Sequence, residues 1–234
     1  SVLCFTDGNT IVPMISAQDH KRISDGDMGA NTGGMGAYAP APVMTKELDK
    51  IVYDTILLPA VKAMKKEGCP FKGCLYAGLM ITKDGPKVVE FNCRFGDPET
   101  EAVLPLLESD LAKIMLACTK GTLKKEKVEW KNACAVDVVL ASEGYPATHS
   151  SGEEIVGLEE AKKTGCLVFH AGSMKKKGRY FVNGGRVLNV AAVAPTLKEA
   201  RDKAYEGVSK ISWRGMQYRH DIADKGLKRL KKRK

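Results

Sequence analysis

Three polar side chains alternate along one short apolar segment near the middle of the chain. Glu90, Asn92 and Arg94 follow Val88 and Val89 at a spacing of two residues, so a β-strand would place all three on one face. A carboxylate and an amide oxygen are hard donors that suit a Mg²⁺ ion carrying nucleotide phosphates. A guanidinium beside them could stabilise negative charge that develops during a reaction.

The residues that follow, GDPE at 96–99, are typical of a tight turn into a new element. Such a turn would place the polar groups at the carboxyl end of a strand, where the sites of α/β proteins are usually built. On these residues alone a second interpretation stays open, in which the segment is an ordinary strand with an exposed polar face.

A hairpin is predicted to position the three groups. Residues 75–82 and 86–92 are strand-like, and the Asp84-Gly85 pair between them is a hairpin signal. A second hairpin is predicted from residues 2–5 and 11–14. Because the chain begins with Ser1 and is at once in a strand, we expect a fragment of a longer protein.

A glycine-rich segment at 18–42 is predicted to be a long loop, because it lacks helical and strand periodicity over most of its length. It carries DHKR at 19–22 ahead of a glycine cluster at 33–36. Glycine lets backbone N–H groups approach an anion, and lysine and arginine add positive charge. The loop is therefore a candidate phosphate site, with a solvated series of turns as the alternative. His20 is more typical of a structural group than of a catalytic one.

The remaining elements are predicted from capping residues and apolar periodicity. Helices are expected from Thr45 to about 66 with a bend at Pro59, from Ser109 through 110 to about 119 and ending at Gly121, and from Thr196 to about 211. Strands are expected at 133–141, 167–170, 179–182 and 186–194.

Composition limits the class of protein. A chain of 234 residues with 44% apolar and 28% charged residues is typical of a soluble globular protein of one or two domains. No membrane span or signal peptide is recognisable, so a cytosolic location is expected. Seven cysteines without a C-x-x-C pair argue against a disulfide framework and a structural zinc site, and indicate reduced thiols in or near the core.

The net charge of +9 is a property of the carboxyl-terminal end. Residues 225–234 hold seven positive charges, which leaves a net charge of +2 on the rest of the chain. Such a run is usually a solvated, frayed terminus, and a polyanion-binding or nuclear-targeting tag is the alternative. Nucleic acid is therefore not an expected partner of the folded part.

Several ordered motifs carry a resemblance to a known family. They are SVLCFTDG (1–8), QDHKR (18–22), NTGGMGAY (31–38), YAGLM (76–80), NCRFGDPE (92–99), LPLL (104–107), SEGYP (142–146), FHAG (169–172), GGRVL (184–188) and YRHDI (218–222). Together they resemble the ATP-grasp ligases, and glycinamide ribonucleotide synthetase in particular, over roughly residues 1–222. The resemblance implies an α+β fold, with the second half of an ATP-grasp domain followed by a small α+β domain. The implied segments are 1–126, 127–224 and a basic tail at 225–234.

The resemblance also implies roles for residues. Glu90 and Asn92 would bind Mg²⁺, or Mn²⁺ in its place, and Arg94 would be catalytic. Many ATP-grasp enzymes carry a second acidic ligand on the preceding strand, where Leu79 or Met80 is expected here. The nucleotide phosphates would be bound by Lys21, Arg22 and Asn31. Candidates for the substrate site are Asp19, Gly33, Gly34, Asp97 and Glu99, of which the last two are alternative metal ligands.

The implied reaction is the ATP-dependent joining of glycine to 5-phosphoribosylamine through a glycyl phosphate in purine biosynthesis. The amino-terminal half of the enzyme is implied to be missing, so we expect this fragment to be inactive alone. One alternative is another ATP-grasp ligase or carboxylase. A second is a non-catalytic remnant that binds polyanions through its basic tail.

Overall fold

The computed structural model describes residues 1–232, which form two compact units. Unit 1 comprises residues 1–17, 40–96 and 106–132, and unit 2 comprises 18–39, 97–105 and the described residues from 133 onward. The predicted segments are contiguous along the chain, whereas the compact units are not, because residues 18–39 and 97–105 pack with the carboxyl-terminal part. All paired strands in the described residues are antiparallel, and helices accompany them, as the α+β prediction requires.

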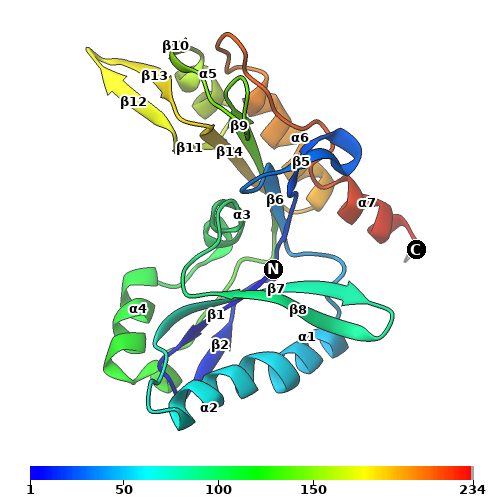
Figure 1. Cartoon of the computed structure of the whole chain (residues 1–234), viewed down its shortest axis with the longest axis vertical. Helices are drawn as coiled ribbons and strands as arrows, with labels where there is room; N and C mark the ends of the chain where they lie inside the picture. Colours follow the sequence, from blue (N-terminus) through cyan, green and yellow to red (C-terminus); the bar gives the residue numbers. More distant parts are fainter. Residues whose placement is uncertain (233–234) are drawn as a thin grey trace. The chain divides into compact units, whose positions relative to one another are not determined.

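Unit 1 is built on a four-stranded sheet in the order β2-β1-β7-β8 (Figure 1). Its strands are β1 (Val2–Thr6), β2 (Ile11–Pro13), β7 (Gly73–Thr82) and β8 (Gly85–Asn92). Both predicted hairpins are confirmed, with β1 paired to β2 and β7 paired to β8. The hairpin β7–β8 therefore presents β8 as an edge strand of the sheet.

One face of this sheet is covered by a helix pair, α1 (Lys46–Val52) and α2 (Leu58–Lys66), as Figure 1 shows. Thr45 caps α1 as predicted, with its side chain accepting from the N–H of Leu48. A π-helical turn joins the helices, and the N–H of Leu58 bonds the carbonyl of Tyr53 five residues earlier. Since Pro59 has no N–H and crowds the preceding turn, the predicted interruption is confirmed at this place.

A second helical region of unit 1 is α4 (Leu111–Lys120), followed by a 3₁₀ turn at Leu123–Lys125. Gly121 ends α4 in the left-handed conformation, as predicted. The predicted cap was wrong by one residue, because Asp110 accepts from the N–H of Lys113. Ser109 instead accepts from the N–H of Glu129 at 2.8 Å, which ties the start of the helix to a later segment.

Unit 2 is built on a five-stranded sheet in the order β11-β14-β9-β6-β3. Its strands are β3 (Gln18–Asp19), β6 (Gly36–Ala39), β9 (Cys134–Ala141), β11 (Leu167–His170) and β14 (Arg186–Ala194). The prediction of a long loop at 18–42 was therefore wrong in part, because β3 and β6 both lie within this segment. β6 enters the sheet by pairing with β9, which lies about a hundred residues later and cannot be found from local periodicity.

Two helices cover opposite faces of this sheet. α6 (Leu197–Val208) begins with a capping box at Thr196, as predicted, and packs its alanines on β9 and β14. α3 (Glu99–Val103), which continues as a 3₁₀ turn at Leu104–Leu106, packs on β6 and β9. Since side chains alternate along a strand, Val190 faces α6 while Asp137 and Asn189 face α3.

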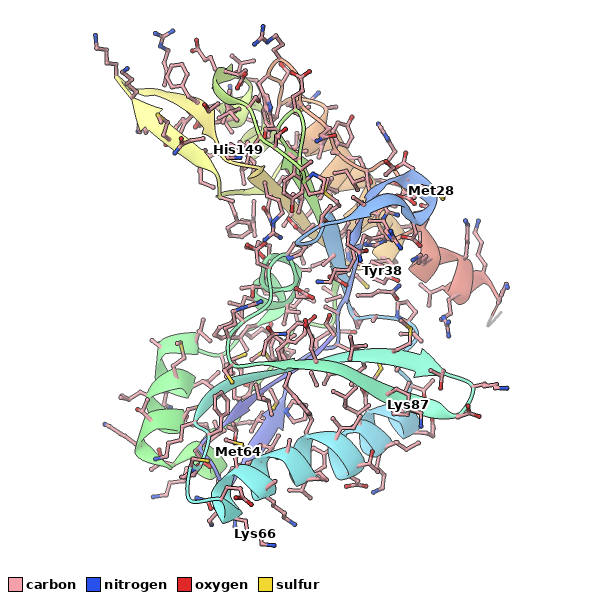
Figure 2. The ribbon with its side chains drawn as sticks, in the orientation of Figure 1. Met28, Tyr38, Met64, Lys66, Lys87 and His149 are labelled. Carbon is pink, nitrogen blue, oxygen red and sulfur yellow. The ribbon has the colours of Figure 1, made fainter. Side chains whose placement is uncertain are left out.

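Smaller elements complete unit 2. They are a hairpin of β4 (Arg22–Ser24) and β5 (Met28–Asn31) around a 3₁₀ turn at Asp25–Asp27, a three-stranded sheet of β10 (Ser151–Ile155), β13 (Arg179–Asn183) and β12 (Ser173–Lys176), and the helix α5 (Leu158–Lys163). Figure 2 labels Met28, which projects from the β4–β5 hairpin, and Tyr38, which is fully buried on β6.

The basic run begins as a helix rather than as a frayed end. α7 spans Asp224–Lys231, and its Gly226 packs against Tyr38 and Leu197. The frayed-terminus prediction is therefore wrong up to Lys231, because a glycine lets α7 approach the buried tyrosine closely. The last two residues of the predicted tail, 233 and 234, lie outside the described residues.

No helix within residues 1–232 combines the length and apolar character that crossing a membrane requires. The seven cysteines are all free thiols, as predicted. Cys69 and Cys93 are exposed, so the expectation that all of the thiols lie in or near the core was wrong for these two.

Candidate functional site

The predicted metal strand is the outer part of the β7–β8 hairpin in unit 1. On β8, Glu90 and Asn92 lie opposite Gly78 and Tyr76 of β7, so both point to the same face of the sheet. The amide nitrogen of Asn92 donates to Glu90 Oε1 at 3.0 Å, and Arg94 Nη2 donates to Asn92 Oδ1 at 3.3 Å. The three groups are therefore joined in one chain of hydrogen bonds, and Glu90 and Asn92 share the face that the spacing predicted.

On the preceding strand the residue opposite Glu90 is Gly78, and neither Leu79 nor Met80 holds this position. That Leu79 or Met80 takes the place of a second acidic ligand stays a prediction. The register shifts between Gly78 and Leu79, because Leu79 pairs with Val88 and leaves an extra residue on β8. A Cβ on Gly78 would lie 3.2 Å from Glu90 Cγ, so glycine gives the carboxylate its room.

The donor set of this strand fits a hard divalent cation. Glu90 is exposed, and it and Asn92 offer the carboxylate and amide oxygens that Mg²⁺ and Mn²⁺ prefer. Within residues 1–232 no group of three or more His, Cys, Asp or Glu could hold a metal by itself. Two protein oxygens would therefore need phosphate and water oxygens to complete the coordination, which is the usual arrangement for Mg²⁺ that binds together with a nucleotide.

The predicted phosphate-binding residues lie on the β4–β5 hairpin and its approach in unit 2. Arg22 pairs with Asn31 across the two strands, and Arg22 Nη1 donates to the carbonyl of Gly29 at 2.6 Å. Lys21 Nζ lies 2.6 Å from Asp19 Oδ2. The structure therefore brings Lys21, Arg22 and Asn31 together at one hairpin and its approach, with their side chains accessible to solvent, while Asp19 reaches Lys21 from β3.

A buried arginine that the sequence did not single out holds this hairpin. The side chain of Arg219 is fully buried and donates through Nε and Nη2 to the two oxygens of Asp221, each at 2.7 Å. Its Nη1 donates to Asp27 Oδ1 at 3.0 Å and to the carbonyl of Arg22 at 3.1 Å. Lys225 adds a second ion pair to Asp27. Although burial alone would raise the pKa of Asp221, hydrogen bonds from Arg219 hold that pKa well below its usual range.

His20 belongs to the same framework. Its burial agrees with the prediction that this histidine is a structural group rather than a catalytic one. It is 1% exposed, its Nδ1 lies 3.2 Å from the carbonyl of Gly36, and its Nε2 has no partner within the described residues. Burial, with the charge of Arg219, lowers the pKa of His20 to about 4. The ring is therefore neutral near pH 7, and Nδ1 must carry the proton to donate to the carbonyl.

The glycines at 33 and 34 and the turn at 97–99 meet in unit 2. Gly34 has φ 125°, and a Cβ there would lie 2.4 Å from Pro98 Cδ, so no other residue fits the contact. Asp97 bonds Arg186, whereas Glu99 is only 1% exposed at the start of α3. A metal-binding role for either carboxylate stays a prediction.

Two buried carboxyl groups beside this turn were missed. Asp137 is fully buried on β9, where Asn189 donates to its Oδ2 at 3.1 Å, and the Oε2 atom of Glu101 is buried on α3. Burial, with the charge of Asp97, raises the pKa of Glu101 to about 7, and burial together with Glu101 raises that of Asp137 well above its usual value. A carboxyl group inside the apolar run CAVDVVLA was the available signal.

Comparisons with known proteins show that the chain is similar to one family of synthetases over most of its length. Residues 1–100 match the family model described as phosphoribosylglycinamide synthetase, ATP-grasp (A) domain, and residues 135–225 match the C domain of the same synthetase. The chain is 53% identical to the trifunctional purine biosynthetic protein adenosine-3 of Gallus gallus, covering 97% of this chain and 23% of that protein. It is 50% identical to the chloroplastic phosphoribosylamine–glycine ligase of Arabidopsis thaliana, covering 97% of this chain and 44% of that ligase.

Solved structures agree with these matches. The phosphoribosylamine–glycine ligase of Thermotoga maritima superposes with a TM-score of 0.85 at 38% identity, covering 95% of this chain and 55% of that one. The urea carboxylase of Kluyveromyces lactis reaches a TM-score of 0.65 at 13% identity, which shows a shared fold only. The chain spans about half the length, or less, of the curated relatives it matches.

Proposed function

Because the chain belongs to the phosphoribosylglycinamide synthetase family, we propose that it forms part of a ligase that joins glycine to 5-phosphoribosylamine at the expense of ATP. The products would be glycinamide ribonucleotide, ADP and phosphate. The observation that carries the proposal is the hydrogen-bonded chain of Glu90, Asn92 and Arg94 on one exposed strand face.

The roles of these residues follow from their chemistry. Glu90 and Asn92 would hold a divalent cation, which when bound would neutralise charge on the β- and γ-phosphates of ATP. Arg94 would stabilise negative charge on the phosphoryl group as it moves to the glycine carboxylate, and on the tetrahedral centre that the amine then forms. No protein nucleophile is needed, so alignment and electrostatics supply the catalysis.

Unit 2 would contribute binding groups for the phosphates. Lys21 and Arg22 carry solvent-accessible positive charge on the β4–β5 hairpin, and Asn31 lies opposite Arg22. Asp19, which pairs with Lys21, would orient that lysine. A cytosolic location is part of the same proposal.

One experiment tests the metal strand. A chimera in which this chain replaces the matching segment of the Arabidopsis thaliana ligase, called here the chimeric ligase, is assayed for glycinamide ribonucleotide formation at saturating Mg²⁺. Glu90→Gln should lower turnover by at least ~10³-fold, because it removes a ligand charge while changing little volume. Asp84→Asn removes one charge from the exposed turn of the same hairpin and should leave turnover unchanged. Full activity of the Glu90→Gln variant would refute the assignment.

A second assay tests whether the chain acts alone. Since it spans about half of a ligase, we propose that its relatives' remaining segment is needed to enclose ATP and exclude water. The isolated chain should form no glycinamide ribonucleotide, while the chimeric ligase should be active. Enzyme-like turnover by the isolated chain would show that the relatives' remaining segment is dispensable.

The other ATP-grasp enzymes remain the alternative in the same class, since their fold is shared at low identity. A non-catalytic remnant that binds polyanions through its basic end is the alternative from another class. Titration with ATP in the presence and absence of Mg²⁺ separates it from an enzyme, because a remnant of this kind should have no metal-dependent affinity for the nucleotide.

A further inference from the structure

Arg186, at the start of β14, is fixed in place by one of its three guanidinium nitrogens. Nη1 donates to Asp97 Oδ1 at 2.9 Å and to the carbonyl oxygens of Asp97 at 2.8 Å and Gly33 at 3.3 Å. All three acceptors belong to unit 2. Since a guanidinium is planar, anchoring one nitrogen at several points also fixes the directions of the other two.

A glycine closes one face of the same guanidinium. A Cβ built on Gly33 would lie 3.0 Å from Cζ and Nη2 of Arg186 and 3.2 Å from its Nε. The backbone N–H of Gly33 donates to the hydroxyl of Tyr145 at 3.0 Å, which holds the glycine against the arginine. Only a residue without a side chain allows this approach without displacing the guanidinium.

The remaining edge of Arg186 is open. Within residues 1–232 its Nε and Nη2 make no hydrogen bond, and neither atom is among the buried unpartnered ones. The side chain as a whole is 21% exposed. Two parallel N–H donors therefore reach the surface in a fixed direction.

Arg219 in the same unit shows what such an edge binds. Its Nε and Nη2 donate to the two oxygens of the Asp221 carboxylate, each at 2.7 Å, and its Nη1 is bonded to protein acceptors as in Arg186. The two arginines thus share the anchoring at Nη1 and differ in the partner of the opposite edge. Where Arg219 has a carboxylate, Arg186 has none.

The charges around Arg186 leave it available for an anion. Asp97 is already bonded to Nη1, and of the other titratable groups nearby, Glu101 on α3 and Asp137 on β9 both have raised pKa values. Burial therefore disfavours the charged form of both carboxyl groups. Neither carboxyl group hydrogen-bonds the open edge.

We propose that the Nε and Nη2 edge of Arg186 binds an oxyanion of a substrate, with Asp97 and Gly33 as the residues that orient it. The ligand chemistry is a carboxylate or phosphate that accepts two parallel hydrogen bonds. Under the proposed function two substrates carry such a group, glycine through its carboxylate and phosphoribosylamine through its phosphate. The identity of the ligand rests on that function, whereas the anion site itself does not.

The test measures binding without turnover. The chimeric ligase is dialysed to equilibrium against radiolabelled glycine in one arm and against ribose 5-phosphate in the other, with no ATP present. Arg186→Lys keeps the charge but loses the planar fork, so affinity for one of the two probes should fall at least ~10-fold. The probe that is affected identifies the substrate group. Arg179→Lys, at an exposed arginine paired with Glu154, should change neither affinity.

A double variant separates binding from simple neutralisation of Asp97. If Arg186 only pairs with Asp97, Arg186→Gln combined with Asp97→Asn should restore wild-type affinity, and that result would overturn the proposal. We expect the double variant to bind as weakly as Arg186→Gln alone, with an unfolding midpoint close to that of the wild type. Unchanged affinity of Arg186→Lys for both probes would also overturn it. A third outcome is possible, in which an Arg186 variant loses affinity for one probe although the chimeric ligase makes no glycinamide ribonucleotide. That result would support the anion site and refute the proposed reaction.

Discussion

The metal strand of unit 1 and the Arg219 cluster of unit 2 use the same kinds of groups in opposite ways. Glu90 on β8 and Arg94 just after it are exposed, and within residues 1–232 their side chains bond only neighbours in sequence. Arg219 is fully buried and bonds residues almost two hundred positions away. The exposed groups keep hydrogen-bond donors and acceptors available for a ligand. The donors of the buried arginine are instead bonded to other parts of the protein and stabilise the fold. Substitutions should therefore change chemistry in one region and stability in the other.

The largest loss of stability is expected from Arg219→Met. The substitution leaves Asp27 and Asp221 without their shared cation and should lower the free energy of unfolding by about 3 kcal/mol, at the lower end for a broken buried pair because both carboxylates reach solvent. Urea unfolding of the chain measures this loss. The matched control is Arg214→Met, at an arginine that is 86% exposed and 3.7 Å from Glu153, which should cost almost nothing. An equal loss of unfolding free energy in the two variants would show that the Arg219 cluster is not a stabilising framework.

The next effect is a pH dependence that His20 introduces. Its folded pKa of about 4 lies below the unfolded value near 6.5, so the unfolded state binds more protons between these values. The contribution of His20 is present above pH 6.5 and is lost as pH falls toward 4, by up to about 3 kcal/mol.

A matched variant isolates this contribution. The raised pKa of Glu101 acts in the opposite sense, because its contribution is lost as pH rises toward 7. The unfolding free energies of the wild type and His20→Gln are measured from pH 7 to pH 4 and subtracted. The subtraction cancels the contributions of Glu101 and of every other group that both proteins contain. A difference that does not change with pH would show that His20 is not held neutral by burial.

Arg94→Lys should affect turnover and leave stability almost unchanged. Loss of the planar donor fork is expected to lower the turnover of the chimeric ligase by ~10²-fold, the usual effect of removing one transition-state donor. Arg179→Lys makes the same replacement at an exposed arginine outside the site and should leave turnover unchanged. A large fall in the unfolding midpoint, with normal turnover of the remaining folded enzyme, would place Arg94 with the structural arginines.

The smallest change is expected from Gly78→Ala. The added methyl group would lie 3.2 Å from Glu90 Cγ, so the carboxylate must shift while the sheet stays intact. Stability should change by less than about 1 kcal/mol, and the Mg²⁺ concentration needed for half-maximal turnover should rise roughly tenfold. Met80→Ala removes an exposed side chain on the same strand and should leave the Mg²⁺ requirement unchanged. An identical shift in both variants would mean that Gly78 does not make room for Glu90.

Local signals predicted the parts of the fold that local physics determines. The Asp84-Gly85 turn indicated the hairpin that carries Glu90, and Thr196 indicated the start of α6. The pairing of β6 with β9 could not be predicted in this way, because the strand GAYA is short and its partner is distant in sequence. The same distance hid the Arg219 cluster, whose hydrogen bonds to Arg22 and Asp27 have no local pattern.

In the candidate site, too, the features set by local sequence could be predicted, and those that depend on distant segments could not. The strand spacing placed Glu90, Asn92 and Arg94 together because that geometry is set within five residues. The register opposite Glu90 depends on an irregular pairing between β7 and β8, so the sequence could not show that Gly78 is the residue that faces the carboxylate. The open edge of Arg186 is visible only when segments at 33, 97 and 186 are brought together.

The pairing of β6 with β9 has a consequence for synthesis on the ribosome. Ala39 pairs with Ala135, so 96 further residues must be added before this partner exists. At a translation rate of roughly 5–20 residues per second, the segment that includes β6 waits about 5 to 20 seconds with an unpaired strand edge. During this interval the nascent chain offers that edge to other strands, which makes it a natural substrate for chaperones.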